Sequence, residues 1–275
     1  MFGINSSVNS TILANLRQIN SDIATTQTRI GTGKKVNSAA DDAAVWAVVQ
    51  SIRTDQSRQE SLSSGISLAK ARADAAVAAL NTTSNLLTQM TKLADDAAGA
   101  SPDYTAITNK FAALKVQIQS VLNGADVKGT SYVIDATAVS VQIGADAANK
   151  VDLAPANQQT ATAMAALLAV TTVSSSGGSA TDMTSSELRT AITNATTQVS
   201  SYQATLSTFA SSLGAQQDFL TALSDIRASA VSSLVDADMT KESAKIAALQ
   251  TQQQLAYQAL SISNSSAQNI LMLFR

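Results

Sequence analysis

Residues 246–274 read IAALQTQQQLAYQALSISNSSAQNILMLF, a run of twenty-nine residues without a charged side chain, proline or glycine. A composition rich in alanine, leucine, glutamine and serine predicts a helix here. Its apolar residues form two stripes, one of Ile246, Leu249, Ala256 and Leu260 and the other of Leu255, Ala259 and Ile262. A helix that is apolar on two sides needs partners on two sides. Because its six glutamines make it too polar to span a bilayer, we expect protein to surround it.

The composition of the whole chain predicts long helices. Hydrophobic residues reach 45%, but alanine supplies most of the excess, and aromatic residues are only 4% of the 275. Alanine-rich heptads let long helices approach each other closely, and only two prolines interrupt the chain. We therefore expect a mainly α fold, a long antiparallel helical hairpin or coiled-coil bundle with a small β element near the middle of the chain.

Several classes of function are disfavoured by the composition. The net charge of −2 and the lack of a large basic cluster argue against nucleic-acid binding. The absence of cysteine and histidine removes the usual zinc ligands and the nucleophiles and bases built on them. We predict no enzymatic activity, no cofactor, no metal site and no membrane insertion. The first residues, MFGIN, carry neither the basic nor the apolar region of a conventional signal peptide.

A heptad pattern over residues 4–30 predicts the first helix. Its seam residues are Ile12, Leu16, Ile19, Ile23 and Ile30. Gly31 and Gly33 predict the end of this helix, because glycine readily adopts the left-handed conformation that closes one. Ser38 or Asp41 is expected to cap a second helix that runs to about Ala98.

The middle of the chain mixes short elements. A third helix is predicted from Ile107 to Asn123. Alternating β-branched residues predict two or three strands within residues 124–160, among them 132–134 and 140–143. Residues 160–170 are expected to form a short helix and residues 174–179 an exposed loop.

The last long seam begins behind a capping box. Residues 184–187, TSSE, have the spacing in which a threonine and a glutamate cap one helix reciprocally. Apolar residues at spacings of three and four then continue from Leu188 to Leu234. The order of long helices, a small β element and long helices again predicts a hairpin that brings the first and last helices together.

The motifs at both ends resemble those of bacterial flagellin. Residues 29–44, RIGTGKKVNSAADDAA, are similar to the flagellin signature RLSSGKRINSAADDAA. Residues 213–217, LGAQQ, residues 236–242, DADMTKE, and residues 267–275, AQNILMLFR, resemble three motifs of the flagellin C-terminal region. The resemblance covers roughly residues 4–98 and 188–275. The segment between them is too short for the variable outer domains of larger flagellins, so the chain resembles the minimal two-domain form of the family.

The resemblance implies a structural subunit of the flagellar filament that self-assembles for motility. Residues 1–38 and 236–275 would form paired terminal helices in the inner core, and residues 39–235 an outer-core domain with its β part at about 124–160. It implies an extracellular protein, exported unfolded by a type III apparatus without a cleaved signal peptide. Implied partners are further copies, as a homopolymer or a mixed filament with paralogous flagellins, together with an export chaperone, the filament cap and hook-junction proteins.

One segment departs from the family pattern. Flagellins that a Toll-like receptor recognises carry LQRVRELAVQ in the second helix. Here residues 87–94 read LTQMTKLA, which lacks both arginines and has lysine in place of glutamate. We predict weak or no recognition by that receptor.

Two groups of residues are the candidate assembly site. The packing group lies on the terminal helices and comprises Ile12, Leu16, Ile19, Ile23, Ile30, Ile246, Leu249, Leu255, Leu260, Ile262, Ile270, Leu273 and Phe274. The electrostatic group comprises the basic residues Arg29, Lys34 and Lys35 and the acidic residues Asp236, Asp238 and Glu242. These charges pair within or between subunits in this hypothesis, and at about 0–1 kcal/mol per exposed pair they set register more than strength.

Two other functions use similar helices. A hook–filament junction protein has flagellin-like ends and is the nearer alternative. The cytoplasmic coiled coil of a chemoreceptor is also rich in alanine, serine and glutamine. However, such rods carry more charge than the 14% of charged residues found here.

Overall fold

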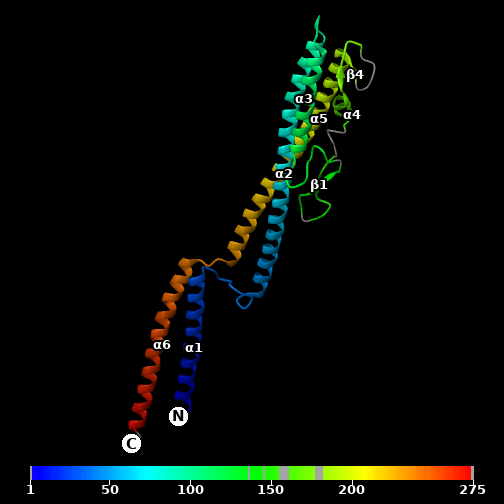
Figure 1. Cartoon of the computed structure of the whole chain (residues 1–275). Helices are drawn as coiled ribbons and strands as arrows, with labels where there is room; N and C mark the ends of the chain where they lie inside the picture. The colour runs from blue at the N-terminus through cyan, green and yellow to red at the C-terminus, as the bar shows by residue number, and fades with distance from the viewer. Residues whose placement is uncertain (1, 136, 145, 155–160, 177–181, 274–275) are drawn as a thin grey trace. The chain divides into compact units, whose positions relative to one another are not determined.

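The computed structural model describes residues 2–135, 137–144, 146–154, 161–176 and 182–273; for residues 2–8 and 266–273 it describes the backbone alone (Figure 1). The helices are α1 (Phe2–Thr32), α2 (Ala43–Ala97), α3 (Tyr104–Gly124), α4 (Thr162–Ala169), α5 (Ser185–Val235) and α6 (Met239–Leu273). The strands are β1 (Val139–Gln142), β2 (Lys150–Leu153), β3 (Thr172–Val173) and β4 (Asp182–Met183). The predicted mainly α fold is confirmed.

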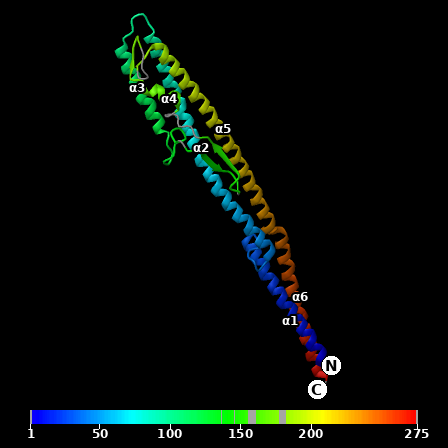
Figure 2. The ribbon, with the colours of Figure 1, turned by 90° about the vertical axis from the view of Figure 1, so that its right-hand side faces the viewer.

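The residues group into two compact units. The terminal unit contains residues 1–56 and 225–275, and the central unit contains residues 57–224. Within the terminal unit, α1 and α6 lie side by side and antiparallel, as both ribbon views show (Figures 1 and 2). The described helices include none that is both long and apolar enough to cross a membrane.

The core of the central unit follows spacings of three and four along α2 and α5. The buried residues include, on α2, Ile66, Ala69, Ala73, Ala76, Leu80, Thr83, Leu87, Met90 and Ala94 and, on α5, Leu188, Ile192, Ala195, Val199, Tyr202, Leu206, Phe209, Leu213 and Leu220. Because much of the α2 seam is alanine, neighbouring backbones can approach closely. Polar pairs at the edges, such as Gln203 with Asn81 (2.8 Å) and Arg189 with Asp95 (2.5 Å), fix the antiparallel register of α2 and α5.

Helix ends follow local chemistry, with one correction. Thr184 and Glu187 form the predicted capping box, in which the Thr184 amide donates to Glu187 Oε2 (2.8 Å) and the Glu187 amide to Thr184 Oγ1 (3.3 Å). The cap of α2, however, is Asp42, whose Oδ1 accepts from the amides of residues 44 and 45 (3.0 Å each). The prediction of Ser38 or Asp41 was wrong, because Asp41 turns back to accept from the amides of residues 37 and 38 (2.9 Å each).

The small β element contains two strands within residues 124–160, as predicted, but one of the two segments named for a strand is not part of it. β1 and β2 pair antiparallel, with Val139 opposite Leu153, and β3 and β4 form a short parallel pair. Residues 132–134 form a turn instead of a strand. Asp135 Oδ2 accepts from the Ser131 amide (2.9 Å), and this bond closes the turn. Tyr132 is buried with its ring edge against Phe209 (centroids 6.0 Å apart), so its apolar character serves the core instead of a sheet.

Many helical hydroxyls bond within their own helix. Thr25 Oγ1 donates to the carbonyl of Ser21 (3.0 Å) and Thr28 Oγ1 to that of Ala24 (3.0 Å). The same bond to the carbonyl four residues back recurs on α2, α5 and α6, for example at Thr82, Thr193 and Thr251. These side chains therefore satisfy their donor groups without a partner from another helix.

Candidate functional site

The candidate site is the pair of terminal helices, α1 and α6, and three polar layers fix its register. In the first, Ser263 Oγ donates to Asn9 Oδ1 (2.6 Å), and Asn9 Nδ2 lies 3.5 Å from Asn264 Oδ1. In the second, Gln253 Nε2 donates to Asn20 Oδ1 (2.6 Å).

Arg29 and Glu242 form the third polar layer, with Nη1 and Oε1 3.5 Å apart. Successive layers are about three helical turns apart on each helix. A shift of one turn would leave their amides without partners, so these layers specify one alignment.

Apolar side chains fill the space between the polar layers. Leu16 and Leu249 are buried, with 7% and 8% of their surface exposed. Six other residues of the predicted packing group are half-buried, namely Ile12, Ile19, Ile23, Ile30, Ile246 and Leu260. One of the two predicted stripes of α6 therefore meets α1 inside the same chain.

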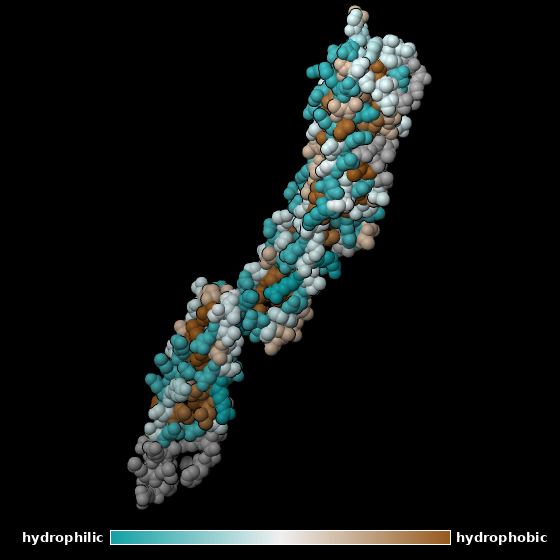
Figure 3. Space-filling model, in the orientation of Figure 1, coloured by the Kyte–Doolittle hydropathy of each residue, from teal (hydrophilic) through white to brown (hydrophobic). Residues whose placement is uncertain are grey.

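The second stripe of α6 is exposed. Leu255 has 57% and Ile262 has 67% of its surface accessible, and Ala259 between them is also exposed. Brown apolar patches are visible at the surface of this helix pair in the space-filling view (Figure 3). The side chains of Ile270 and Leu273, and all of Phe274, lie outside the described residues. The chain thus presents the unpartnered apolar face that its sequence predicts.

A short backbone ladder joins the two chain segments where α1 ends and α6 begins. Gly33 closes α1 with a φ of +70°, as predicted, and its carbonyl accepts from the Ala237 amide (2.9 Å). Lys34 and Asp236 form an antiparallel β-bridge, and the Lys35 amide donates to the Val235 carbonyl (2.7 Å). Sequence reasoning missed this ladder, because backbone pairing between segments 200 residues apart leaves no periodic signal.

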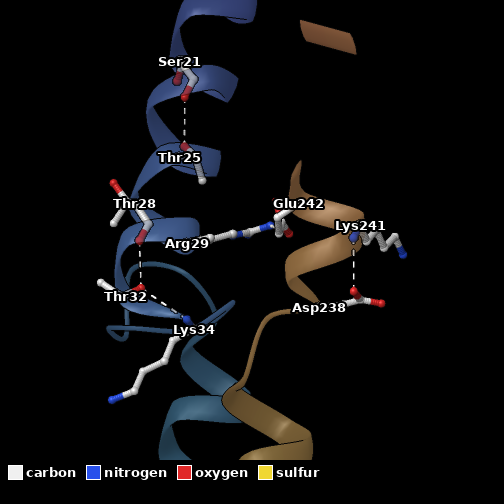
Figure 4. A network of polar contacts seen from close by, with 9 residues as sticks. All are labelled: Ser21, Thr25, Thr28, Arg29, Thr32, Lys34, Asp238, Lys241 and Glu242. Carbon is white, nitrogen blue, oxygen red and sulfur yellow. Dashed lines mark hydrogen bonds and ion pairs between the residues drawn. The ribbon is translucent and has the colours of Figure 1, made fainter. Parts of the chain in front are cut away.

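Some charges of the electrostatic group form an ion pair or cap a helix, and others do not (Figure 4). Glu242 meets Arg29, as described above. Asp238 Oδ1 caps α6 by accepting from the amides of Thr240 (3.0 Å) and Lys241 (3.1 Å).

The remaining charges of the electrostatic group do not pair across the two segments. Asp236 accepts a hydrogen bond from the Ser232 hydroxyl. Lys35 Nζ donates to the Ser233 carbonyl (2.9 Å), whereas the side chain of Lys34 extends away from Asp238 and Glu242.

The Arg29–Glu242 pair is incomplete. Arg29 Nε, Glu242 Oε2 and the nearby Thr26 Oγ1 are buried atoms without a hydrogen-bond partner among the described residues. A guanidinium and a carboxylate can form two parallel bonds, but here a single long contact is made. Sequence reasoning selected both charged residues and missed Thr26, whose burial on the seam is anticipated only by its spacing from Ile23 and Ile30.

The described residues contain no group of three or more acidic side chains arranged to hold a metal ion.

Comparisons with known proteins match both halves of the chain. The family model for the bacterial flagellin N-terminal helical region matches residues 4–137, and that for the C-terminal helical region matches residues 190–274. Flagellin FljM of Caulobacter vibrioides is 32% identical over 266 residues, covering 96% of this chain and 94% of that protein.

Relatives from two further genera match over similar lengths. A flagellin of Brucella melitensis biotype 1 is 32% identical over 271 residues, covering 96% of both chains. Flagellin C of Rhizobium meliloti is 28% identical over 307 residues, again covering 96% of both chains. The crystal structure of Bacillus cereus flagellin aligns with 18% identity and a TM-score of 0.37, covering 57% of this chain and 84% of that chain.

Proposed function

We propose a mechanism of assembly for this chain, which belongs to the bacterial flagellin family and is a structural subunit of the flagellar filament. In this mechanism the subunit polymerises through its terminal helices. The observation that carries the proposal is the second stripe of α6, Leu255, Ala259 and Ile262, which stays exposed after α1 has covered the first. Neighbouring subunits bury this stripe.

The proposed assignment of residues to inner core and outer core follows the pair of terminal helices. Residues 1–38 and 236–275 form the inner core of the filament, and residues 39–235 form the outer-core domain. The backbone ladder at residues 33–35 and 235–237 supports a boundary there. The two compact units divide elsewhere, after residue 56 and before residue 225, since the first turns of α2 and the last turns of α5 belong to the terminal unit.

Burial of the exposed stripe provides the driving force. Removing a leucine or isoleucine side chain from water contributes about 1.5–3 kcal/mol. Leu255 and Ile262 retain more than half of their surface for this purpose, and Leu13 on α1 retains 45%. A factor of ten in affinity corresponds to about 1.4 kcal/mol, so a few such residues per contact are sufficient to lower the critical concentration by orders of magnitude.

The setting of the protein is proposed from its family. The filament lies outside the cell, and the chain reaches it unfolded through a type III export apparatus without a cleaved signal peptide. An export chaperone, the filament cap and hook-junction proteins are its transient partners, and the filament contains this chain alone or with paralogous flagellins. The relatives that match it over nearly their full length are named flagellins, and none of those cited is named as a junction protein.

Weak recognition by the Toll-like receptor is a further part of the proposal. In residues 87–94 the surface positions are Thr88, Gln89 and Lys92, while Leu87 and Met90 are buried. Residues 87–94 contain no arginine. A receptor-reporter assay with purified monomer should therefore give little response, and a strong response would contradict the proposal.

Deletion of residues 246–275 tests the assembly mechanism. The truncated chain should form no filaments, because both stripes of α6 are lost. The core of the central unit lies within residues 66–220 and should stay folded, so circular dichroism should still report a helical protein. Long filaments of the truncated chain in electron micrographs would refute polymerisation through the terminal helices.

A further inference from the structure

A hollow of about 260 Å³ lies beside the end of α1 in the terminal unit. Ala24, Thr25 and Thr28 supply a wall of small side chains, and Arg29 and Lys34 bring positive charge. A cavity of roughly 150 Å³ can accept a benzene-sized group, so this basic hollow has room for a branched aliphatic side chain.

Part of the positive charge of the basic hollow is left unpaired, because Arg29 meets Glu242 whereas Lys34 forms no ion pair among the described residues. Asp41 lines it too, and bonds from two backbone amides lower the pKa of its carboxyl, but this carboxylate makes no ion pair with Lys34. Asp236 and Asp238 are likewise occupied by bonds near their own positions. Among the described residues the Lys34 ammonium has no partner, and its side chain extends away from the acids of α6 (Figure 4).

A complementary pair of residues is exposed on α5 in the same unit. Ile226 has 65% of its surface accessible, and Asp225 beside it is exposed. Of the carboxylates of the terminal unit, Asp225 is the one that contacts no hydrogen-bond donor or cation among the described residues. The next residue, Arg227, is half-buried, and its guanidinium reaches the Asp55 carbonyl on α2 (3.4 Å). Asp225 and Ile226 therefore form an exposed acidic and apolar pair on α5, next to a residue that contacts α2.

We propose that Asp225 and Ile226 of one subunit dock into the basic hollow of a neighbouring subunit. Ile226 packs on Ala24 and the methyl groups of Thr25 and Thr28, and Asp225 pairs with Lys34. This inference rests on the proposed polymerisation and specifies one of its contacts. The two surfaces are different patches of the same chain, so each copy offers one of each, and such head-to-tail contacts propagate into an open helical array.

A disulfide ladder tests this contact directly. Because the chain contains no cysteine, Thr28→Cys and Ile226→Cys introduce the sole thiols. Filaments of the double variant, once oxidised, should yield dimers, trimers and longer covalent chains on a non-reducing gel, since each subunit is joined to one copy on each side. Either single variant should remain monomeric. Assembled filaments of the double variant that give no ladder after oxidation would overturn the contact.

Charge reversal provides an independent test. Asp225→Lys and Lys34→Glu should each raise the critical concentration for assembly several-fold, and the double variant should recover most of that loss. A control combination, Lys34→Glu with Glu60→Lys, should recover none, although Glu60 is also an exposed carboxylate. A double variant no better than the singles, or singles that assemble normally, would refute the contact and leave the filament function intact. Failure of the unmodified chain to polymerise would instead count against the proposed function.

Discussion

At the scale of single residues, the buried hydroxyl of Tyr202 shows how a hydrogen bond inside the core affects the pKa of a side chain. The Tyr202 hydroxyl donates to the carbonyl of Tyr132 inside the central unit. Burial, and secondarily the neighbouring Tyr132 phenol, raises the pKa of Tyr202 to about 12. The folded protein therefore favours the protonated phenol, which can donate that bond.

The Tyr202 pKa predicts an alkaline loss of stability. A raised folded-state pKa means that this contribution is complete below pH 10, the ordinary value for tyrosine, and is lost as the pH rises to about 12. Ultraviolet titration should show one phenol that ionises near pH 12 and disappears in Tyr202→Phe. Between pH 10 and 12 the melting temperature of Tyr202→Phe should fall less than that of the parent. An equal fall would contradict the assignment of the alkaline loss of stability to Tyr202.

Fully buried alanines on α2 set the closeness of its packing. Ala73 has no exposed surface, whereas Ala71, two residues earlier, is exposed. Ala73→Leu should destabilise the central unit by about 1–3 kcal/mol, because a larger side chain there forces neighbouring backbones apart. Ala71→Leu, the matched control, should stay within about 0.5 kcal/mol of the parent. Chemical denaturation followed by circular dichroism measures both, and equal effects would contradict close packing at Ala73.

Prediction of single residues from sequence is limited where two adjacent residues can fill the same role. Spacings of three and four identify the buried positions from Ile66 to Ala94, because an α-helix brings such residues to one face. They do not distinguish Asp41 from Asp42 as the cap of α2. Both carboxylates can reach free amides, and the backbone ladder with residues 235–237 decides the path of the chain before α2. This ladder joins segments 200 residues apart, so a local sequence pattern does not predict it.

At the scale of elements, α6 is divided between a partner inside the chain and an open face. Leu249 packs toward α1, and Leu255 and Ile262 are exposed. The sequence predicts two stripes, but both consist of leucine, isoleucine and alanine, so the structure is needed to tell which one meets α1. The turn at residues 132–134 has a similar origin, since β-branched and aromatic residues are equally suited to a strand and to a buried turn.

The two faces of α6 predict different phenotypes. Leu255→Ser with Ile262→Ser should leave the monomer helical and raise the critical concentration at least about tenfold, because each lost burial costs about 1.5–3 kcal/mol. Leu249→Ser should instead lower the stability of the α1–α6 pair in the monomer. Sedimentation measures the first effect, and limited proteolysis of the terminal segments measures the second. Normal assembly of the double variant would show that this face has no neighbour.

At the scale of the whole molecule, stability is unevenly distributed. A continuous buried core runs through the central unit, from Ile66 on α2 to Leu220 on α5. Between residues 9 and 32 of α1 and residues 239 and 265 of α6, where side chains are described, only a few are buried, among them Leu16, Thr26 and Leu249. Segments with few buried contacts open most readily.

Hydrogen exchange should report this difference. In the monomer, the amides of α1 and α6 should exchange faster than those of α2 between Ile66 and Ala94. In filaments the terminal helices should become strongly protected, because neighbouring subunits cover their open faces. Mass spectrometry of peptides from both states gives the comparison. Equal protection of α1 and α2 in the monomer would contradict the expected imbalance.

The hydroxyls that bond back within their own helices have a mechanical consequence. The exposed Thr82, Thr193 and Thr251 present methyl groups and satisfied hydroxyls at the surface, without a donor that requires one fixed acceptor. An interface tied by directional side-chain bonds holds at one position and resists any displacement. Faces of this kind can instead be displaced relative to each other at low energetic cost. We therefore expect a filament of such subunits to respond to bending by small displacements between neighbouring subunits before any helix unfolds.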